Sequence, residues 1–95
     1  NNFNIFKHQF YLKNKEKGTY IQFDTNTGLL YDKYMTKNTN GIFNINPESG
    51  YYTIVNNKNE KMILFDRYII KFTESKNIIT NENLFKLNII YEIID

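Results

Sequence analysis

The glycine-punctuated stretch from residue 36 to residue 54 constrains the fold of this chain more than any other segment. It reads T-K-N-T-N-G-I-F-N-I-N-P-E-S-G-Y-Y-T-I. Each glycine precedes a run in which apolar and polar residues alternate, first Phe43 and Ile45, then Tyr52 and Ile54. Alternation with a period of two places one side of an extended strand in a core, and glycine permits tight turns between strands. The segment therefore predicts a small antiparallel β protein.

Other segments show a similar pattern and are expected to form further strands. We expect strands over residues 6–12, 20–24, 29–35, 43–45, 51–55 and 62–73, with a short apolar pair at 78–79. Because alternation places these side chains on one face of each strand, the expected core consists of Ile21, Phe23, Phe43, Ile45, Tyr52, Ile54 and Phe72. The expected fold class is all-β.

Two short polar connections are predicted to be glycine turns between facing strands. In the first, Asp24 is expected to accept backbone N–H bonds while Gly28 adopts a positive φ. Gly41 is expected to adopt a positive φ in the second turn for the same reason, since glycine has no Cβ to oppose it. Pro47 cannot donate to a β ladder, so it is expected at a strand end before a corner over residues 47–50.

The C-terminal segment fits either of two structures. Apolar residues alternate from position 85 to position 93, but Ile90 and Ile94 lie on the otherwise polar side. As a helix, the segment would be apolar around nearly its whole circumference, which is a poor amphipathic pattern for a small protein. The isoleucine content and the alternation favour a long strand.

Length and composition point to one domain spanning residues 1–95. The 95 residues are 41% hydrophobic and include eight Tyr and eight Phe, which can supply a core. There is no Cys, so packing must hold the fold together without disulfides or a thiolate metal site. Twelve basic and ten acidic residues are spread along the chain, which does not indicate binding of nucleic acid or of an anionic membrane.

No segment has the roughly 20 consecutive apolar residues that span a bilayer, and residues 1–3 do not resemble a signal peptide. We therefore expect no membrane insertion. The domain is expected to be excised from a larger protein.

Spaced residues in the two turn regions resemble those of a known family. They are Asp24-x-x-Thr27-Gly28, Thr36, Asn40-Gly41-x-Phe43-x-Ile45 and Gly50-x-Tyr52-x-Ile54. At these positions the chain resembles the family of transthyretin-like, carboxypeptidase regulatory-like domains. The resemblance implies an antiparallel β-sandwich of about seven strands. It also implies an accessory module, without catalytic activity, of a secreted or cell-envelope protein.

The resemblance also gives expectations for location and partners. Such a module is expected outside the cytoplasm, in the periplasm, at the outer membrane or on the surface of a bacterium. It is expected to act as a spacer or as a docking domain for other domains of its own chain or for envelope and surface proteins. Two alternatives stay open, a carbohydrate-binding module and an adhesin stalk domain.

A related branch, the Cna B-type adhesin domains, often forms an internal Lys–Asn isopeptide bond that a buried acid promotes. Lys7 or Lys13 with Asn88 could imitate the bonding pair. The position that corresponds to the promoting acid is Asn56. An amide cannot shuttle protons as a carboxyl group does, so we do not expect the bond to form.

The remaining reactive residue types do not suggest an active site. His8 is the sole histidine, and Ser49 and Ser75 are the sole serines, so neither a histidine-based metal site nor a nucleophile with its base is indicated. We expect no enzyme activity, no catalytic or cofactor-binding residue, and no metal or cofactor.

The tyrosines are candidate ligand contacts. Strand alternation predicts that Tyr31 and Tyr34 lie on opposite faces of their strand, and likewise Tyr51 and Tyr52. Two or more coplanar exposed rings on one sheet would favour a sugar ligand, and their absence a protein partner.

Overall fold

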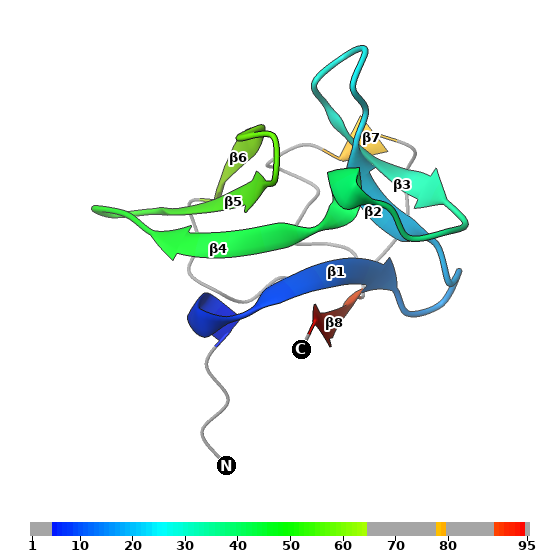
Figure 1. Ribbon diagram of the computed structural model, residues 1–95, viewed down its shortest axis with the longest axis horizontal. Coiled ribbons are helices and arrows are strands. Elements are labelled where there is room, and N and C mark those ends of the chain that lie inside the picture. Colours follow the sequence, from blue (N-terminus) through cyan, green and yellow to red (C-terminus); the bar gives the residue numbers. More distant parts are fainter. Residues whose placement is uncertain (1–4, 65–77, 80–88, 95) are drawn as a thin grey trace.

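The computed structural model describes residues 5–64, 78–79 and 89–94, and these residues form an antiparallel β fold (Figure 1). Their elements, in chain order, are η1 (Ile5–Lys7), β1 (Gln9–Asn14), β2 (Tyr20–Phe23), β3 (Leu30–Tyr34), η2 (Thr39–Gly41), β4 (Phe43–Pro47), β5 (Tyr52–Asn56), β6 (Lys61–Leu64), β7 (Ile78–Ile79) and β8 (Ile89–Ile94), where η denotes a 3-10 turn. The expected all-β class is confirmed.

Strand β1 lies at the centre of the pairing. All six of its residues pair with β8, from Gln9 opposite Ile94 to Asn14 opposite Ile89. It also pairs with β4, at Phe10, and with β2, at Leu12 and Lys13. Since β8 takes one edge along its full length, β4 and β2 share the other. Two wings, β4–β5–β6 and β2–β3–β7, therefore diverge from one strand, as Figure 1 shows.

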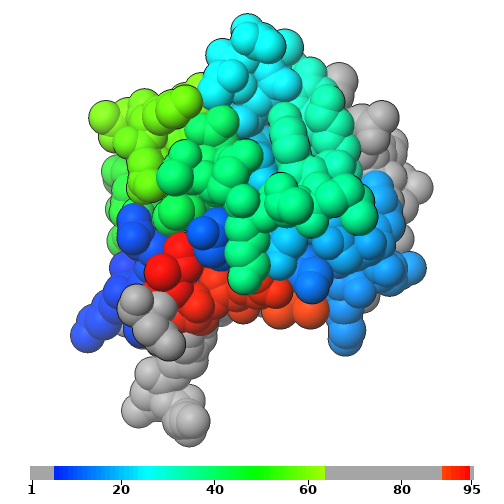
Figure 2. Space-filling view, turned by 45° about the vertical axis from the view of Figure 1, so that its right-hand side comes forward, coloured from blue at the N-terminus to red at the C-terminus, as the bar shows by residue number. Residues whose placement is uncertain are grey.

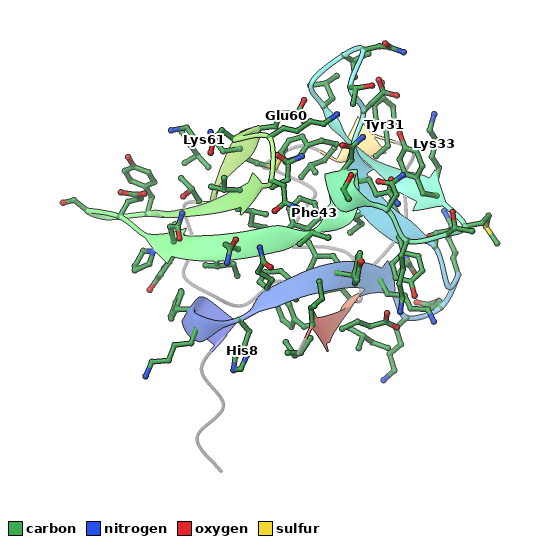
Figure 3. All side chains as sticks on the ribbon, viewed as in Figure 1. His8, Tyr31, Lys33, Phe43, Glu60 and Lys61 are labelled. Atoms are coloured by element: carbon green, nitrogen blue, oxygen red, sulfur yellow. The ribbon has the colours of Figure 1, made fainter. Side chains whose placement is uncertain are left out.

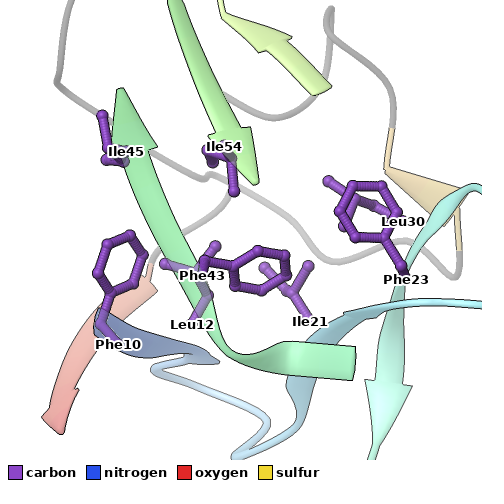
Figure 4. Close-up of a cluster of buried hydrophobic side chains, with 8 residues drawn as sticks. All are labelled: Phe10, Leu12, Ile21, Phe23, Leu30, Phe43, Ile45 and Ile54. Carbon is purple, nitrogen blue, oxygen red and sulfur yellow. The ribbon is translucent and has the colours of Figure 1, made fainter. Parts of the chain in front are cut away.

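The hydrophobic core collects side chains from β1 and from both wings. Its buried members are Phe10, Leu12, Ile21, Phe23, Leu30, Phe43, Ile45 and Ile54 (Figure 4). Five of the seven predicted core residues are among them, all except Tyr52 and Phe72. Tyr52 is half-buried and stacks on Phe6 with ring centroids 5.5 Å apart, and Phe72 lies outside the described residues.

Most of the predicted strands are present, with shifted ends. The strand predicted over residues 6–12 is wrong at its start, because Ile5–Lys7 forms a 3-10 turn and β1 runs over Gln9–Asn14. The strand reading of the C-terminal segment is confirmed for Ile89–Ile94, and residues 85–88 lie outside the described part. Of the strand predicted over 62–73, the described residues give β6, and the remainder falls outside them.

The two predicted glycine turns differ from each other. Gly28 has φ +72°, and the Asp24 carboxylate accepts the backbone N–H of Thr27 at 3.1 Å, as predicted. Gly41 is not among the residues with positive φ, so that prediction is wrong. It lies in η2, on a connection between strands that do not pair, and a Cβ there would come within 2.8 Å of the Gln22 Cγ. A larger residue at this position would have to displace the Gln22 side chain, so close packing favours glycine.

Gly28 offers a direct test of its turn. Replacing it with valine is expected to lower the free energy of unfolding by about 1 kcal/mol more than replacing it with asparagine, which tolerates positive φ better. Nothing lies within 4 Å of a Cβ at this position, so the difference reports backbone strain alone. Urea unfolding of the two variants measures it, and equal losses would contradict the turn conformation.

Candidate binding face

A β-bulge in β3 shapes the outer surface of the β2–β3 wing. Tyr34 pairs with Tyr20, whereas the next pair along joins Asp32 to Ile21, so Lys33 is the extra residue. A bulge interrupts the alternation of side chains and re-aims those beyond it. The Lys33 Nζ accordingly lies 4.7 Å from the ring centroid of Tyr31 and 5.7 Å from that of Tyr34.

The predicted placement of Tyr31 and Tyr34 on opposite faces is therefore wrong. Strict alternation would place the two side chains on opposite faces of the sheet. The extra residue between them turns Tyr34 to the same face as Tyr31. Figure 3 shows Tyr31 and Lys33 close together, far from His8. Nothing in a single sequence marks a bulge at Lys33, which is why the alternation argument failed.

The same outer surface continues across the neighbouring strands. Phe10 and Leu12 of β1 point into the core. Because side chains alternate along a strand, Tyr11 and Lys13 point outward. Tyr11 contacts Tyr20 of β2, with ring centroids 6.1 Å apart and an angle of 74° between the ring planes. We call this surface the tyrosine–lysine face and define it by Tyr11, Lys13, Tyr20, Tyr31, Lys33, Tyr34, Lys37 and Glu92.

Each lysine of the tyrosine–lysine face lies over a tyrosine ring. The Lys13 Nζ is 5.6 Å from the centroid of Tyr20, and the Lys37 Nζ is 5.4 Å from that of Tyr11. Ring faces carry partial negative charge and attract ammonium groups at these distances. Rings and positive charges are therefore interleaved.

Glu92 joins the C-terminal strand to this face. Its carboxylate accepts a hydrogen bond of 2.9 Å from the Tyr20 hydroxyl and pairs with Lys37 at 3.3 Å and with Lys13 at 3.7 Å. Lys37 comes from the segment after β3, and Figure 2 shows that segment's green atoms beside the red atoms of β8. Three parts of the chain that are distant in sequence thus meet at one carboxylate.

The contacts shift the acid–base properties of the groups involved. Partial burial by itself raises the pKa of Glu92, but the hydrogen bonds from Tyr20 and Lys37 and the two lysine charges hold it below its ordinary value. Burial, followed by the hydrogen bond to Glu92, raises the pKa of the Tyr20 hydroxyl. Glu92 also raises the pKa of Lys37. Glu92 is therefore charged and both partners are protonated at neutral pH.

The Glu92 contacts predict a pH-dependent contribution to stability. A carboxylate whose pKa is lowered by folding stabilises the fold above its unfolded pKa, and that stabilisation is lost as the pH falls through the folded value. Replacing Glu92 with glutamine is expected to lower the free energy of unfolding at pH 7 by about 0.5–1 kcal/mol, since the pairs are partly exposed. The loss should shrink as the pH falls below the ordinary value of 4.5.

Urea unfolding at pH 7 and at pH 3 measures this effect. Replacing Glu16, an exposed residue in the β1–β2 turn, with glutamine makes the matched control, for which little change is expected at either pH. A loss for the Glu92 variant that is as large at pH 3 as at pH 7 would contradict the assignment.

On the inner side of the bulge, Asp32 is the centre of a buried polar cluster. The side chain of Asp32 is fully buried, and its two carboxylate oxygens accept hydrogen bonds from the Asn14 amide, at 3.0 Å, and from the Thr19 hydroxyl. The Asn14 side-chain oxygen in turn accepts the backbone N–H groups of Glu16 and Lys17, both at 2.9 Å. The cluster ties the β1–β2 turn to β3. This cluster was not predicted from the sequence, although alternation from Leu30, which is buried, places Asp32 on the inner side of β3.

Of the residues considered for chemistry, His8 and Ser49 are described, and they lie in different connections of the fold. His8 is partly exposed between η1 and β1, Ser49 is exposed in the corner after β4, and Ser75 lies outside the described residues. Within the described ranges, no three His, Cys, Asp or Glu side chains gather as a metal site would require. Among the same residues, no helix is long and apolar enough to cross a membrane.

Of the residues considered for an isopeptide bond, Lys13 and Asn56 have other partners in the described structure. Lys13 pairs with Glu92, Lys7 is exposed in η1, and Asn88 lies outside the described residues. Asn56 is buried and donates to the Glu60 carboxylate at 2.8 Å, and its oxygen accepts two backbone N–H groups of the β5–β6 turn. The position expected for a promoting acid thus holds an amide that organises a turn.

The chain was compared with family models, curated proteins and solved structures. None of the three comparisons found a match.

Proposed function

We propose that this chain is a non-catalytic interaction module that docks a protein partner through the tyrosine–lysine face. The observation that carries the proposal is the bulge at Lys33, which gathers Tyr31, Lys33 and Tyr34 on one side of the sheet. Bulges are common where a side chain is re-aimed for function. Tyrosine combines a large apolar ring with a polar hydroxyl and is enriched at the energetic centres of protein interfaces.

The arrangement of the tyrosine rings favours a protein over a carbohydrate as the bound partner. A sugar-binding platform presents coplanar, uncovered ring faces, whereas Tyr11 and Tyr20 meet at 74°. The ring faces of Tyr11, Tyr20 and Tyr31 also lie beneath lysine ammonium groups. Interleaved rings and charges suit a partner that presents both apolar and acidic side chains.

We extend the proposal to the architecture and the setting of the module. The β4–β5–β6 and β2–β3–β7 wings would form the two layers of a transthyretin-like, carboxypeptidase regulatory-like sandwich, and core residues from both wings support this. The resemblance rests on Asp24-x-x-Thr27-Gly28 and the later glycine motifs. It suggests a spacer or docking domain of a secreted or cell-envelope protein outside the cytoplasm.

Site-specific photocrosslinking tests the docking function. A benzoylphenylalanine in place of Tyr31, in the full-length protein within the cells that produce it, is expected to crosslink to a defined protein. The control carries the same group at Asn46, an exposed position on β4 in the other wing. Crosslinks that are equal at both positions, or a domain that binds only glycans on an array, would overturn the proposal.

A further inference from the structure

We infer that the partner segment recognised by the tyrosine–lysine face is an acidic peptide with an apolar residue among its carboxylates. The inference rests on the proposed docking function and adds the chemical class of the partner. Three observations carry it: a carboxylate already bound on this face, a lysine without an ion pair beside two tyrosines, and an exposed methionine next to them.

Glu92 shows how this face holds a carboxylate. Two ammonium groups, from Lys13 and Lys37, and the Tyr20 hydroxyl surround one carboxylate within 3.7 Å. The Tyr20 hydrogen bond is charge-assisted, and such bonds are stronger than those between neutral groups. The face thus already contains a pattern of ammonium and phenol groups that binds a carboxylate.

Lys33 lies beside two more tyrosines and forms no direct ion pair with a described carboxylate. Its ammonium lies over Tyr31 and Tyr34. The Asp24 carboxylate accepts the backbone N–H groups of Asn26, at 2.8 Å, and Thr27, at 3.1 Å, and the Tyr34 hydroxyl, at 3.4 Å. These hydrogen bonds and, to a smaller extent, the charge of Lys33 lower the pKa of Asp24. Because Lys33 interacts with Asp24 only through this longer-range attraction, its ammonium can still bind a carboxylate from outside the domain directly.

The face itself has an excess of positive charge. It carries three lysines, Lys13, Lys33 and Lys37, and one carboxylate, that of Glu92, which pairs with two of the three. Opposite charge on a partner would steer its approach and fix its register on the face. This complementarity selects an acidic partner over a neutral one.

Met35 provides an exposed apolar side chain directly after the same strand. It follows Tyr34 directly and is 72% exposed, the highest value among the large hydrophobic residues described as exposed. Methionine is flexible and polarizable, so it adapts to apolar side chains of a partner. An apolar residue flanked by acidic ones would contact Met35 while its neighbours reach Lys33.

A titration of the domain with two decapeptides tests the charge requirement. One peptide contains nine glutamates and a central leucine, and the other contains ten glutamates. At physiological ionic strength, where charges beyond about 8 Å are screened, we expect saturable binding that shifts the amide resonances of Tyr31, Lys33 and Tyr34. Changing Lys33 to glutamate should weaken binding of the leucine peptide about tenfold.

The control variant carries the same charge change elsewhere. Lys58, exposed in the β5–β6 turn, is changed to glutamate, and binding is expected to change less than about twofold. Lys33 and Lys58 are both exposed, so both variants should fold. Equal weakening by the two variants would show general charge attraction and overturn the inference.

The leucine tests the apolar anchor. It should strengthen binding to the unaltered domain about threefold, and this gain should vanish when Met35 is replaced by glutamine, because the apolar contact is lost. No binding of either peptide, or tighter binding to heparin or to phosphatidylserine vesicles, would overturn the acidic-peptide inference. Protein crosslinks from Tyr31 combined with such a result would leave the docking function standing.

Discussion

Replacing Phe43 with alanine is expected to lower the free energy of unfolding by about 3–5 kcal/mol, because it opens a cavity in the middle of the core. Phe43 is fully buried, and its ring centroid lies 6.4 Å from that of Phe10 and 5.8 Å from that of Phe23 (Figure 4). It thus joins β1 and the β2–β3 wing to β4. Since small domains have about 5–15 kcal/mol of stability in total, the variant should be close to unfolding.

Urea unfolding followed by circular dichroism measures this loss. Met35, which is 72% exposed, provides the control, because its replacement by alanine removes side-chain atoms without leaving a cavity. That loss is expected to stay within about 0.5 kcal/mol. A loss below 1 kcal/mol for the Phe43 variant would contradict its place in the core.

Strand alternation could predict much of the core because it depends only on neighbouring positions. Ile21, Phe23, Phe43, Ile45 and Ile54 are all buried as the pattern indicates. Phe10, Leu12 and Leu30 complete the core but were not predicted. The burial of Phe10 and Leu12 follows from the central place of β1 between β8 and the two wings, which is set by long-range pairing.

The glycines show again that local sequence patterns do not report contacts between distant segments. Gly28 acts through its own backbone conformation, which the turn sequence around it indicates. Gly41 lies in η2 and acts through its contact with Gln22 of β2, and no local sequence pattern indicates that contact. A glycine in a sequence therefore indicates a position with a steric constraint. It does not indicate whether the constraint comes from the backbone conformation or from a neighbouring side chain.

The candidate face could not have been predicted for a related reason. A bulge depends on the register between two strands, and the shift between β2 and β3 places Tyr31, Lys33 and Tyr34 together against the alternation rule. The meeting of Lys13, Lys37 and Glu92 likewise needs β8 beside β1. The sequence contains each residue of this face, but their grouping depends on which strands pair and in which register.

The second large effect is expected at Asp32, on the inner side of the bulge. Replacing Asp32 with alanine should lower the free energy of unfolding by about 2–3 kcal/mol, since it leaves the Asn14 amide and the Thr19 hydroxyl buried without their acceptor. Both partners are nearly fully buried, with 3% and 6% of their surfaces exposed, so water cannot easily replace the carboxylate. Urea unfolding at pH 7 measures the loss, and a value below 0.5 kcal/mol would contradict the role of the cluster.

Asparagine at position 32 separates hydrogen bonding from charge. Its amide oxygen can accept from Asn14, and its amide nitrogen can donate to Thr19, because a hydroxyl rotates and also accepts hydrogen bonds. The Asp32→Asn variant is therefore expected to lose less than about 1 kcal/mol and to keep the acidic-peptide affinity of the unaltered domain. The alanine variant should bind more weakly, because the Asp32 side chain holds β3 in place directly before the bulge at Lys33. If asparagine costs as much as alanine, the carboxylate charge itself holds β3 in place, and hydrogen bonding does not explain the cluster.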